Sequence, residues 1–235
     1  MTRVLIIATL CAAWAAPSVA ASKFAVPEGC TAFLTAQLHG CVVSQHYRCE
    51  ADAPGDQRSA LIDSDGLFYL SHIDRETRWI DSISVISGTQ DKLIVEADPA
   101  SFSTLLMTGR DDFDFRTENN FGEVLRYTGY DSLTGESVVI DGVKLEQTRF
   151  ELSGFSEDGS VLFRRKGKQF IHRDWRLFFA DRETAETPEG QSEETFSTPV
   201  TFSLPGEAGF LDAEPRFDCE MTMTGAPLPL GKEPS

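Results

Sequence analysis

Residues 30–49 read CTAFLTAQLHGCVVSQHYRC, and this stretch decides the predicted fold. From Thr31 to Leu38 every even-numbered residue is Ala or Leu, while most odd-numbered ones are polar. This alternation is typical of a half-buried strand. His39-Gly40 suits a two-residue turn that returns the chain as a second strand. The resulting hairpin places Cys30 directly across from Cys49.

Four cysteines follow the N-terminal apolar run, namely Cys30, Cys41, Cys49 and Cys219. An even number in an exported chain predicts disulfides, with three possible pairings. A straight strand separates Cys41 from Cys49 by ~26 Å, whereas a disulfide needs α-carbons within ~7 Å. We therefore predict the pairs Cys30–Cys49 and Cys41–Cys219. If residues 31–38 form a helix ending at Gly40 instead, the other pairings stay open.

A metal site is the alternative use of these residues. His39, Cys41, His46 and Cys49 are residue types that bind zinc, but their spacing is not that of the common zinc knuckles, and Cys219 would be left over. A redox motif of the form Cys-x-x-Cys is absent. The sequence therefore favours disulfides and predicts no metal and no cofactor.

The N-terminus has the features of a secretory signal. Arg3 precedes an apolar run over residues 4–16, and Ser18 and Ala20 are small residues at the spacing that signal peptidase prefers. We expect a signal peptide over residues 1–20, cleavage after Ala20, and a periplasmic or secreted protein. The apolar run is shorter than the ~20 residues that span a bilayer, so no membrane span is expected. The net charge of −16 disfavours nucleic acid as a partner.

The rest of the chain reads as short strands separated by turn residues. We expect one antiparallel β domain over residues 21–224, forming a curved sheet or an open or half barrel of about nine to eleven strands. Turns are predicted at residues 131–135 and at Asp141-Gly142. The acidic residues 183–198 are interpreted as a flexible surface loop. Residues 225–235 are interpreted as a disordered tail.

One short helix is predicted to pack against the sheet. Asp98 suits its N-cap, Pro99 its first helical position and Gly109 its end. The intervening SFSTLLMT is apolar on several sides, which favours a buried helix.

Three stretches carry a resemblance as a set: CVVSQHYRCEADAPGDQ, YDSLTGESVVIDGVKLEQTRFE and HRDWRLFFA. Together they resemble an uncharacterised family of secreted proteins from proteobacteria, and the resemblance implies a periplasmic address. A curved antiparallel sheet with a short Pro-initiated helix is also similar, at the level of fold alone, to the lipoprotein-carrier half-barrels of the periplasm. A shared fold does not fix a function.

No catalytic residue is predicted. Nucleophile elbows, zinc-binding HExxH helices and phosphate-binding glycine loops are absent. Asp63-Ser64-Asp65-Gly66 resembles the start of a calcium loop, but His72 occupies the position of its closing glutamate, so a plain β-turn is favoured. A surface or hydrogen-bonded structural role is favoured for each of the four histidines, His39, His46, His72 and His172. The alternative is that His46 and His72 face one another across neighbouring strands, and a hydrolase would need them to converge with a carboxylate.

Aromatic residues on the predicted strands are the candidate ligand site. The ordinary interpretation is a packed core, and the alternative is an apolar cavity on the concave side of the sheet. The candidate cavity residues are Phe113, Phe115, Tyr127, Phe150, Phe163, Phe170, Trp175 and Phe179. A basic cluster, Arg164, Arg165, Lys166 and Lys168, is either a solvated hairpin or a contact for an anionic partner.

Three functions follow from these features. The first is a non-enzymatic scaffold or interaction module of the cell envelope, which binds an unknown protein. The second is a periplasmic carrier that holds an apolar or lipidated ligand on the concave face. The third is a hydrolase with an unrecognised site.

Overall fold

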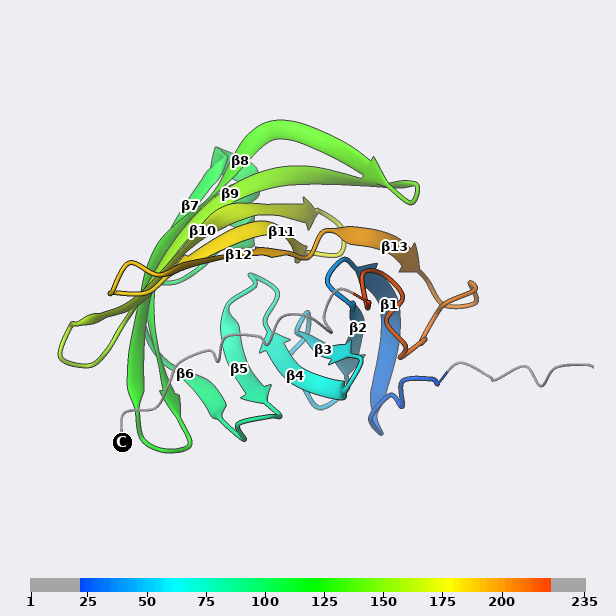
Figure 1. Cartoon of the computed structure of the whole chain (residues 1–235), viewed down its shortest axis with the longest axis horizontal. Coiled ribbons are helices and arrows are strands. Elements are labelled where there is room, and N and C mark those ends of the chain that lie inside the picture. The colour runs from blue at the N-terminus through cyan, green and yellow to red at the C-terminus, as the bar shows by residue number, and fades with distance from the viewer. Residues whose placement is uncertain (1–21, 221–235) are drawn as a thin grey trace, which may run out of the picture.

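The computed structural model describes residues 22–220, so the expected signal peptide and the expected C-terminal tail lie outside the described residues. The described chain forms a single sheet of thirteen antiparallel strands with one short helix (Figure 1). The strands are β1 (Cys30–Leu38), β2 (Val42–Cys49), β3 (Gln57–Asp63), β4 (Gly66–Ile73), β5 (Trp79–Ser84), β6 (Gln90–Asp98), β7 (Arg110–Asn119), β8 (Val124–Ile140), β9 (Val143–Phe155), β10 (Val161–His172), β11 (Leu177–Glu186), β12 (Ser192–Phe196) and β13 (Pro199–Ser203).

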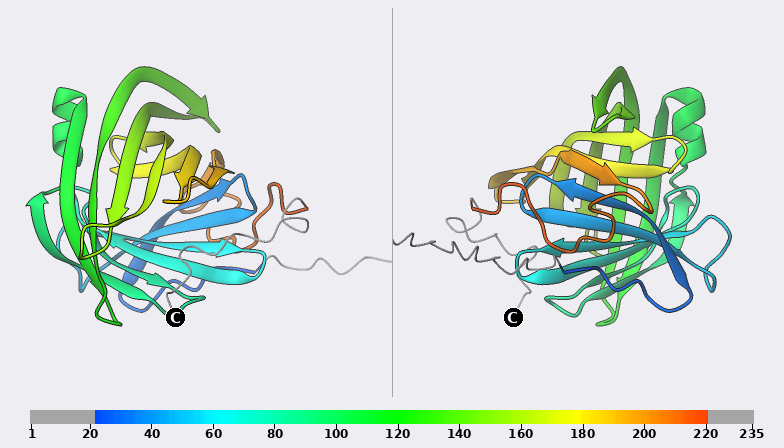
Figure 2. Two further views of the ribbon diagram at one scale, coloured as in Figure 1. Left: turned by 60° about the vertical axis from the view of Figure 1, so that its left-hand side comes forward. Right: turned by 90° about the vertical axis from the view of Figure 1, so that its right-hand side faces the viewer.

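The strand order follows the chain from β12 back to β1, and β13 then pairs with the outer side of β1. The sheet curls strongly without closing into a barrel, as the views in Figure 2 show. The prediction of a mainly β, curved antiparallel sheet with one short helix is confirmed. The edges of the sheet are β12 and β13.

The first hairpin pairs Cys30 with Cys49 as predicted, but its turn and its register differ from the prediction. The turn contains three residues, His39 to Cys41, because Leu38 pairs with Val42. Gly40 and Cys41 both take positive φ angles, of 79° and 60°. A β-bulge at Phe33 then shifts the register by one residue, and Cys30 lies directly across from Cys49. The turn contains one residue more than predicted, and the extra residue that the bulge places in β1 offsets it, so the pairing of the two cysteines is unchanged.

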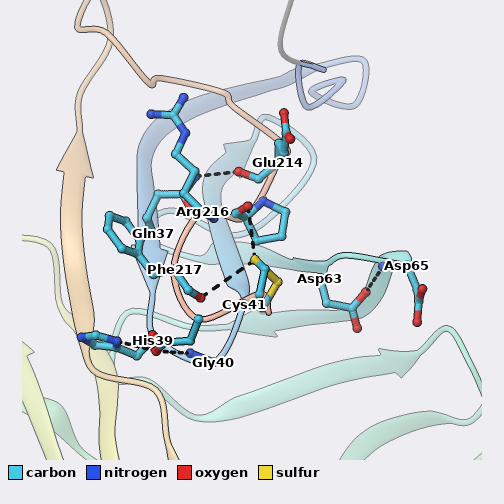
Figure 3. The surroundings of a disulfide bond; sticks show 12 residues. Gln37, His39, Gly40, Cys41, Asp63, Asp65, Glu214, Arg216 and Phe217 are labelled. Carbon is cyan, nitrogen blue, oxygen red and sulfur yellow. Dashed lines mark hydrogen bonds and ion pairs between the residues drawn. A yellow bond between two sulfur atoms is a disulfide. The ribbon is translucent and has the colours of Figure 1, made fainter. Parts of the chain in front are cut away.

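Both predicted disulfides are present. Cys30 bonds Cys49, with their α-carbons 3.9 Å apart, and Cys41 bonds Cys219 across 178 residues of sequence. Figure 3 shows how the C-terminal segment reaches Cys41. The side chain of Gln37 donates to the Glu214 carbonyl (3.0 Å) and accepts from the Arg216 amide (3.1 Å), and the Cys41 amide donates to the Phe217 carbonyl (2.7 Å).

Two predicted loops are strands in the structure. Residues 131–135 do not form a turn, because β8 runs through them and absorbs the irregularity as a bulge between Leu133 and Ser137. Residues 183–198 are not a loop, because β11 continues to Glu186 and β12 pairs with it. These differences raise the number of strands at the C-terminal end. All five residues of β12 are exposed, so their composition resembles that of a loop.

The helix α1 (Phe102–Thr108) begins later than predicted. Its N-cap is Ser101, whose side chain accepts a hydrogen bond from the Thr104 amide, rather than Asp98, which ends β6. Gly109 ends the helix with a φ of 84°, as predicted. Phe102 and Leu105 are buried against Ile171, Leu133 and Phe178, so α1 is fixed next to β7 and β8.

Two further clusters hold the sheet together. One joins β1 and β13 to β9, β10 and β11 through eight buried residues: Leu34, Ala36, Leu38, Leu145, Phe170, Leu177, Phe179 and Phe202. The other lies on the opposite face of β1 to β3, where Phe24 and Phe210 from the terminal segments cover Ala32, Tyr47 and Ala60. The Cys41–Cys219 disulfide therefore clamps a segment that buries part of the core.

Candidate functional site

A partly open cavity of about 180 Å³ lies on the concave face of the sheet. Strands β5 to β11 and the segment leading into α1 contribute to its walls. Its apolar walls include Trp79, Phe102, Phe113, Phe115, Phe150 and Phe178. Its polar lining includes Arg78, Glu96, Asp111, Asp131, Arg165 and Glu183.

The aromatic residues of one wall form a continuous row. Phe115 and Tyr127 stack at 5.1 Å between ring centroids, and Trp79 packs edge-on against both, at 5.4 and 5.6 Å. Phe113 continues the row at one end and Phe163 at the other. Edge-to-face and offset contacts of this kind are favourable beyond the area they bury, so this wall is rigid.

The structure divides the eight candidate cavity residues into two sets. Phe113, Phe115 and Phe150 line the cavity, and Tyr127 and Phe163 extend its aromatic row. The other three, Phe170, Trp175 and Phe179, do not line it and pack in the cluster around Leu34 and Phe202.

The reason for this division is the alternation of side chains along a strand. In β10, Arg165 and Gln169 line the cavity, so Phe170 points to the opposite face. In β11, Phe178 lines the cavity and Phe179 points away from it. The positions of Phe163 and Phe170 in β10 differ by an odd number, so the two side chains point to opposite faces of the sheet.

Two aspartates at one end of the cavity are the main feature missed by the sequence analysis. Asp111 of β7 and Asp131 of β8 are direct cross-strand partners on the cavity face. Asp111 is only 7% exposed, and one of its carboxylate oxygens accepts a hydrogen bond from the Ser101 amide (2.7 Å). Asp131 falls within the turn predicted over residues 131–135, so it was not expected on a strand opposite Asp111.

Burial changes the acidity of both carboxyls. Burial raises the pKa of Asp131 to about 7, and the neighbouring charge of Asp111 adds to this effect. Burial likewise raises the pKa of Asp111 to about 6, although the Ser101 amide opposes the shift. Both carboxyls therefore titrate close to neutral pH, where a bound charge has a large effect on their protonation.

The arginines of the cavity are already paired. Arg165 forms a two-pronged ion pair with Glu183, at 2.5 and 2.8 Å. Arg78 bonds both Asp74 and Glu96. Within the predicted basic cluster, Arg165 thus faces the cavity, while Arg164 and Lys166 are exposed on the other side of β10.

The histidines do not converge. His46 and His72 lie on opposite faces of the sheet, because His46 pairs in register with Ser59 and His72 with the adjacent Arg58. The alternative that they face one another is wrong. His46 is buried, which lowers its pKa to about 4, and it contacts the Ser44 hydroxyl at 2.9 Å.

His72 belongs to a separate charged network on the other face. Its Nε2 lies 2.9 Å from Asp56, and its Nδ1 lies 2.7 Å from Asp81. The neighbouring Arg58 pairs with Asp52. Neither His46 nor His72 lines the cavity, so neither is placed to act on a molecule bound there.

The described chain offers little for metal binding. The Asp63 carboxylate accepts hydrogen bonds from the amides of Asp65 and Gly66, which is the geometry of a turn. No group of three or more His, Cys, Asp or Glu side chains within residues 22–220 is arranged to hold a metal ion. His39, proposed as a possible ligand, contacts Asp218 at 2.6 Å, and both cysteines near it are in disulfides.

Two further observations bear on identity. Within residues 22–220, no helix has the length and apolar character needed to cross a bilayer. Comparisons with protein-family models, with curated proteins and with solved structures found no match to this chain.

Proposed function

We propose that the protein is a binding module whose concave cavity takes a small apolar group, either a whole ligand or the end of a longer one. The observation that carries this proposal is the aromatic-lined cavity of about 180 Å³. An apolar cavity of about 150 Å³ is known to hold benzene, so this one has room for a single ring or a short alkyl segment. A long acyl chain would have to continue outside it.

The wall at Trp79 is open to solvent, so the rest of a longer ligand can extend past it. Trp79 lines the cavity and is still 44% exposed, so its ring contacts both the cavity and the solvent. Apolar pockets with a few placed polar groups are the usual form of small-molecule sites. We infer that the ligand enters past Trp79.

The other candidate functions receive less support. A hydrolase with converging histidines needs a geometry that the cavity does not supply, because neither His46 nor His72 lines it. A role as a scaffold or interaction module stays a prediction. The two disulfides support an oxidising compartment, and we infer a periplasmic or secreted protein.

A binding experiment with a blocked cavity tests the proposal. Ala100 lines the cavity at its rim and is only partly buried, so Ala100→Phe is expected to fill the cavity without disturbing the core. Isothermal titration calorimetry with 2-phenylethanol, a neutral single-ring probe, is expected to show one saturable site in the natural chain. The affinity is expected to fall at least tenfold in the variant, because the added ring occupies the same space.

Ala97→Phe is the matched control. Ala97 is exposed and is not among the residues that line the cavity, so the same substitution there is expected to leave the cavity open. This variant is expected to bind the probe like the natural chain. Equal binding by the Ala100 and Ala97 variants, or no binding by the natural chain, would refute the proposal.

A further inference from the structure

The cavity lining contains more carboxylates than its two arginines can neutralise. Among the polar groups of its lining, Arg165 is held by Glu183, and Arg78 by Glu96 and Asp74. Each guanidinium is therefore engaged by its own carboxylates. Asp111 and Asp131 have no ion pair with any of the described residues.

The two aspartates are placed to act together. They are direct partners across β7 and β8, and cross-strand partners on one face hold their β-carbons about 5 Å apart. The Ser101 amide fixes one oxygen of Asp111. The Asp131 carboxylate makes no hydrogen bond within residues 22–220; the residue is partly buried and lines the cavity. An ionised carboxylate enclosed in this way is costly unless a partner reaches it.

Aromatic rings flank the same two carboxyls. Phe150 is the register partner of Asp131 on β9, and Phe113 follows Asp111 on the cavity face of β7. Rings attract a cation over their faces, and two carboxylates supply the opposite charge. This combination suits an ammonium group attached to an apolar body.

We propose that the ligand of the cavity is an amphipathic amine, whose protonated ammonium group lies between Asp111 and Asp131 and whose apolar part packs on the aromatic wall. This inference rests on the proposed function and specifies its ligand class. A neutral alcohol with the same apolar part, which lacks only the ammonium group, serves as the comparison.

The charge of the site changes with pH in a defined direction. The raised pKa values of Asp131 (about 7) and Asp111 (about 6) leave both carboxyls ionised above pH 7 and mainly protonated at pH 5. Asp98, Asp112 and Glu76 are the other acidic groups that act on Asp111, and Glu76 is itself paired with Arg176. A bound ammonium favours the ionised carboxyls, so amine binding is expected to be strongest above pH 7 and to weaken as the pH falls.

The test compares an amine with its neutral counterpart. Calorimetric titration of the full chain with phenethylamine and with 2-phenylethanol at pH 8 is expected to show at least tenfold tighter binding of the amine. In Asp131→Asn, which leaves Asp111 in place, the preference for the amine is expected to fall at least threefold while the affinity for the alcohol stays unchanged. Asp112→Asn removes an equal charge from the exposed face of β7, and it is expected to keep the preference. At pH 5 the preference in the natural chain is expected to fall severalfold.

The outcomes separate this inference from the proposed function. Equal binding of amine and alcohol by the natural chain at pH 8 overturns the inference and leaves the cavity as an apolar site. An undiminished preference in Asp131→Asn also overturns it. Failure of the natural chain to bind either probe overturns both proposals. The comparison in the natural chain needs no variant, so it stands even if Asp131→Asn folds poorly.

Discussion

Replacing Cys41 and Cys219 together by serine is expected to lower the free energy of unfolding by about 5 kcal/mol. The disulfide closes a loop of 178 residues, and a longer loop removes more conformational entropy from the unfolded chain. The same bond holds residues near Phe217 against the first hairpin. Chemical denaturation of the oxidised variant and of the natural chain measures the difference.

The second disulfide provides the control. Cys30–Cys49 closes a loop of 19 residues, for which the same chain-entropy argument gives about 3 kcal/mol. Replacing Cys30 and Cys49 by serine is therefore expected to cost less. A smaller loss for the Cys41–Cys219 variant than for the Cys30–Cys49 variant would contradict the view that the long-range bond is the main clamp.

Gly129→Ala is expected to cost about 3 kcal/mol or more, which is the upper end of the range for overpacking. A β-carbon at Gly129 would meet the Glu151 carbonyl oxygen at 2.1 Å and the Phe113 ring at 2.8 Å. Glycine at this position lets β8 approach β9 closely and lets Phe113 lie over its backbone, so it permits the bend of the sheet. Because Phe113 lines the cavity, the variant is also expected to bind 2-phenylethanol more weakly.

Gly159→Ala separates crowding from backbone strain. Gly159 has a φ of 88° and no atom within 4 Å of an added β-carbon, so its substitution is expected to cost only about 1 kcal/mol, from the left-handed backbone. Urea unfolding of the two variants measures both losses. If Gly129→Ala is no worse than Gly159→Ala, close strand approach at Gly129 does not shape the cavity.

The first hairpin shows what local sequence patterns determine. Alternation from Thr31 to Leu38 and the glycine at position 40 predicted the hairpin, because these features depend on neighbours in sequence, but the predicted turn was one residue too short. Cys30 still lies opposite Cys49 because the bulge at Phe33 compensates, and no compositional signal marks this bulge. Side chains alternate along a strand, so assigning Phe163 and Phe170 to one strand would already have placed them on opposite faces.

The site was harder to predict than the fold. Asp111 and Asp131 meet through the register of β7 on β8, which the short turn over residues 119–123 sets. The predicted turn over residues 131–135 hid this pairing, because it removed Asp131 from the strand. Among 37 acidic residues, composition alone does not distinguish these two from surface charge. Their burial becomes apparent only when the sheet curls and α1 covers its end.

The indole N–H signals of Trp79 and Trp175 in a nitrogen-15 NMR spectrum test the central claim most directly, that the concave cavity is the binding site. Trp79 lies on the cavity wall, whereas Trp175 stacks on His172 at 3.9 Å, away from the cavity. During titration with 2-phenylethanol, the Trp79 signal is expected to shift with saturation while the Trp175 signal stays in place. A titration that leaves Trp79 unmoved, or that shifts only Trp175, would contradict the account.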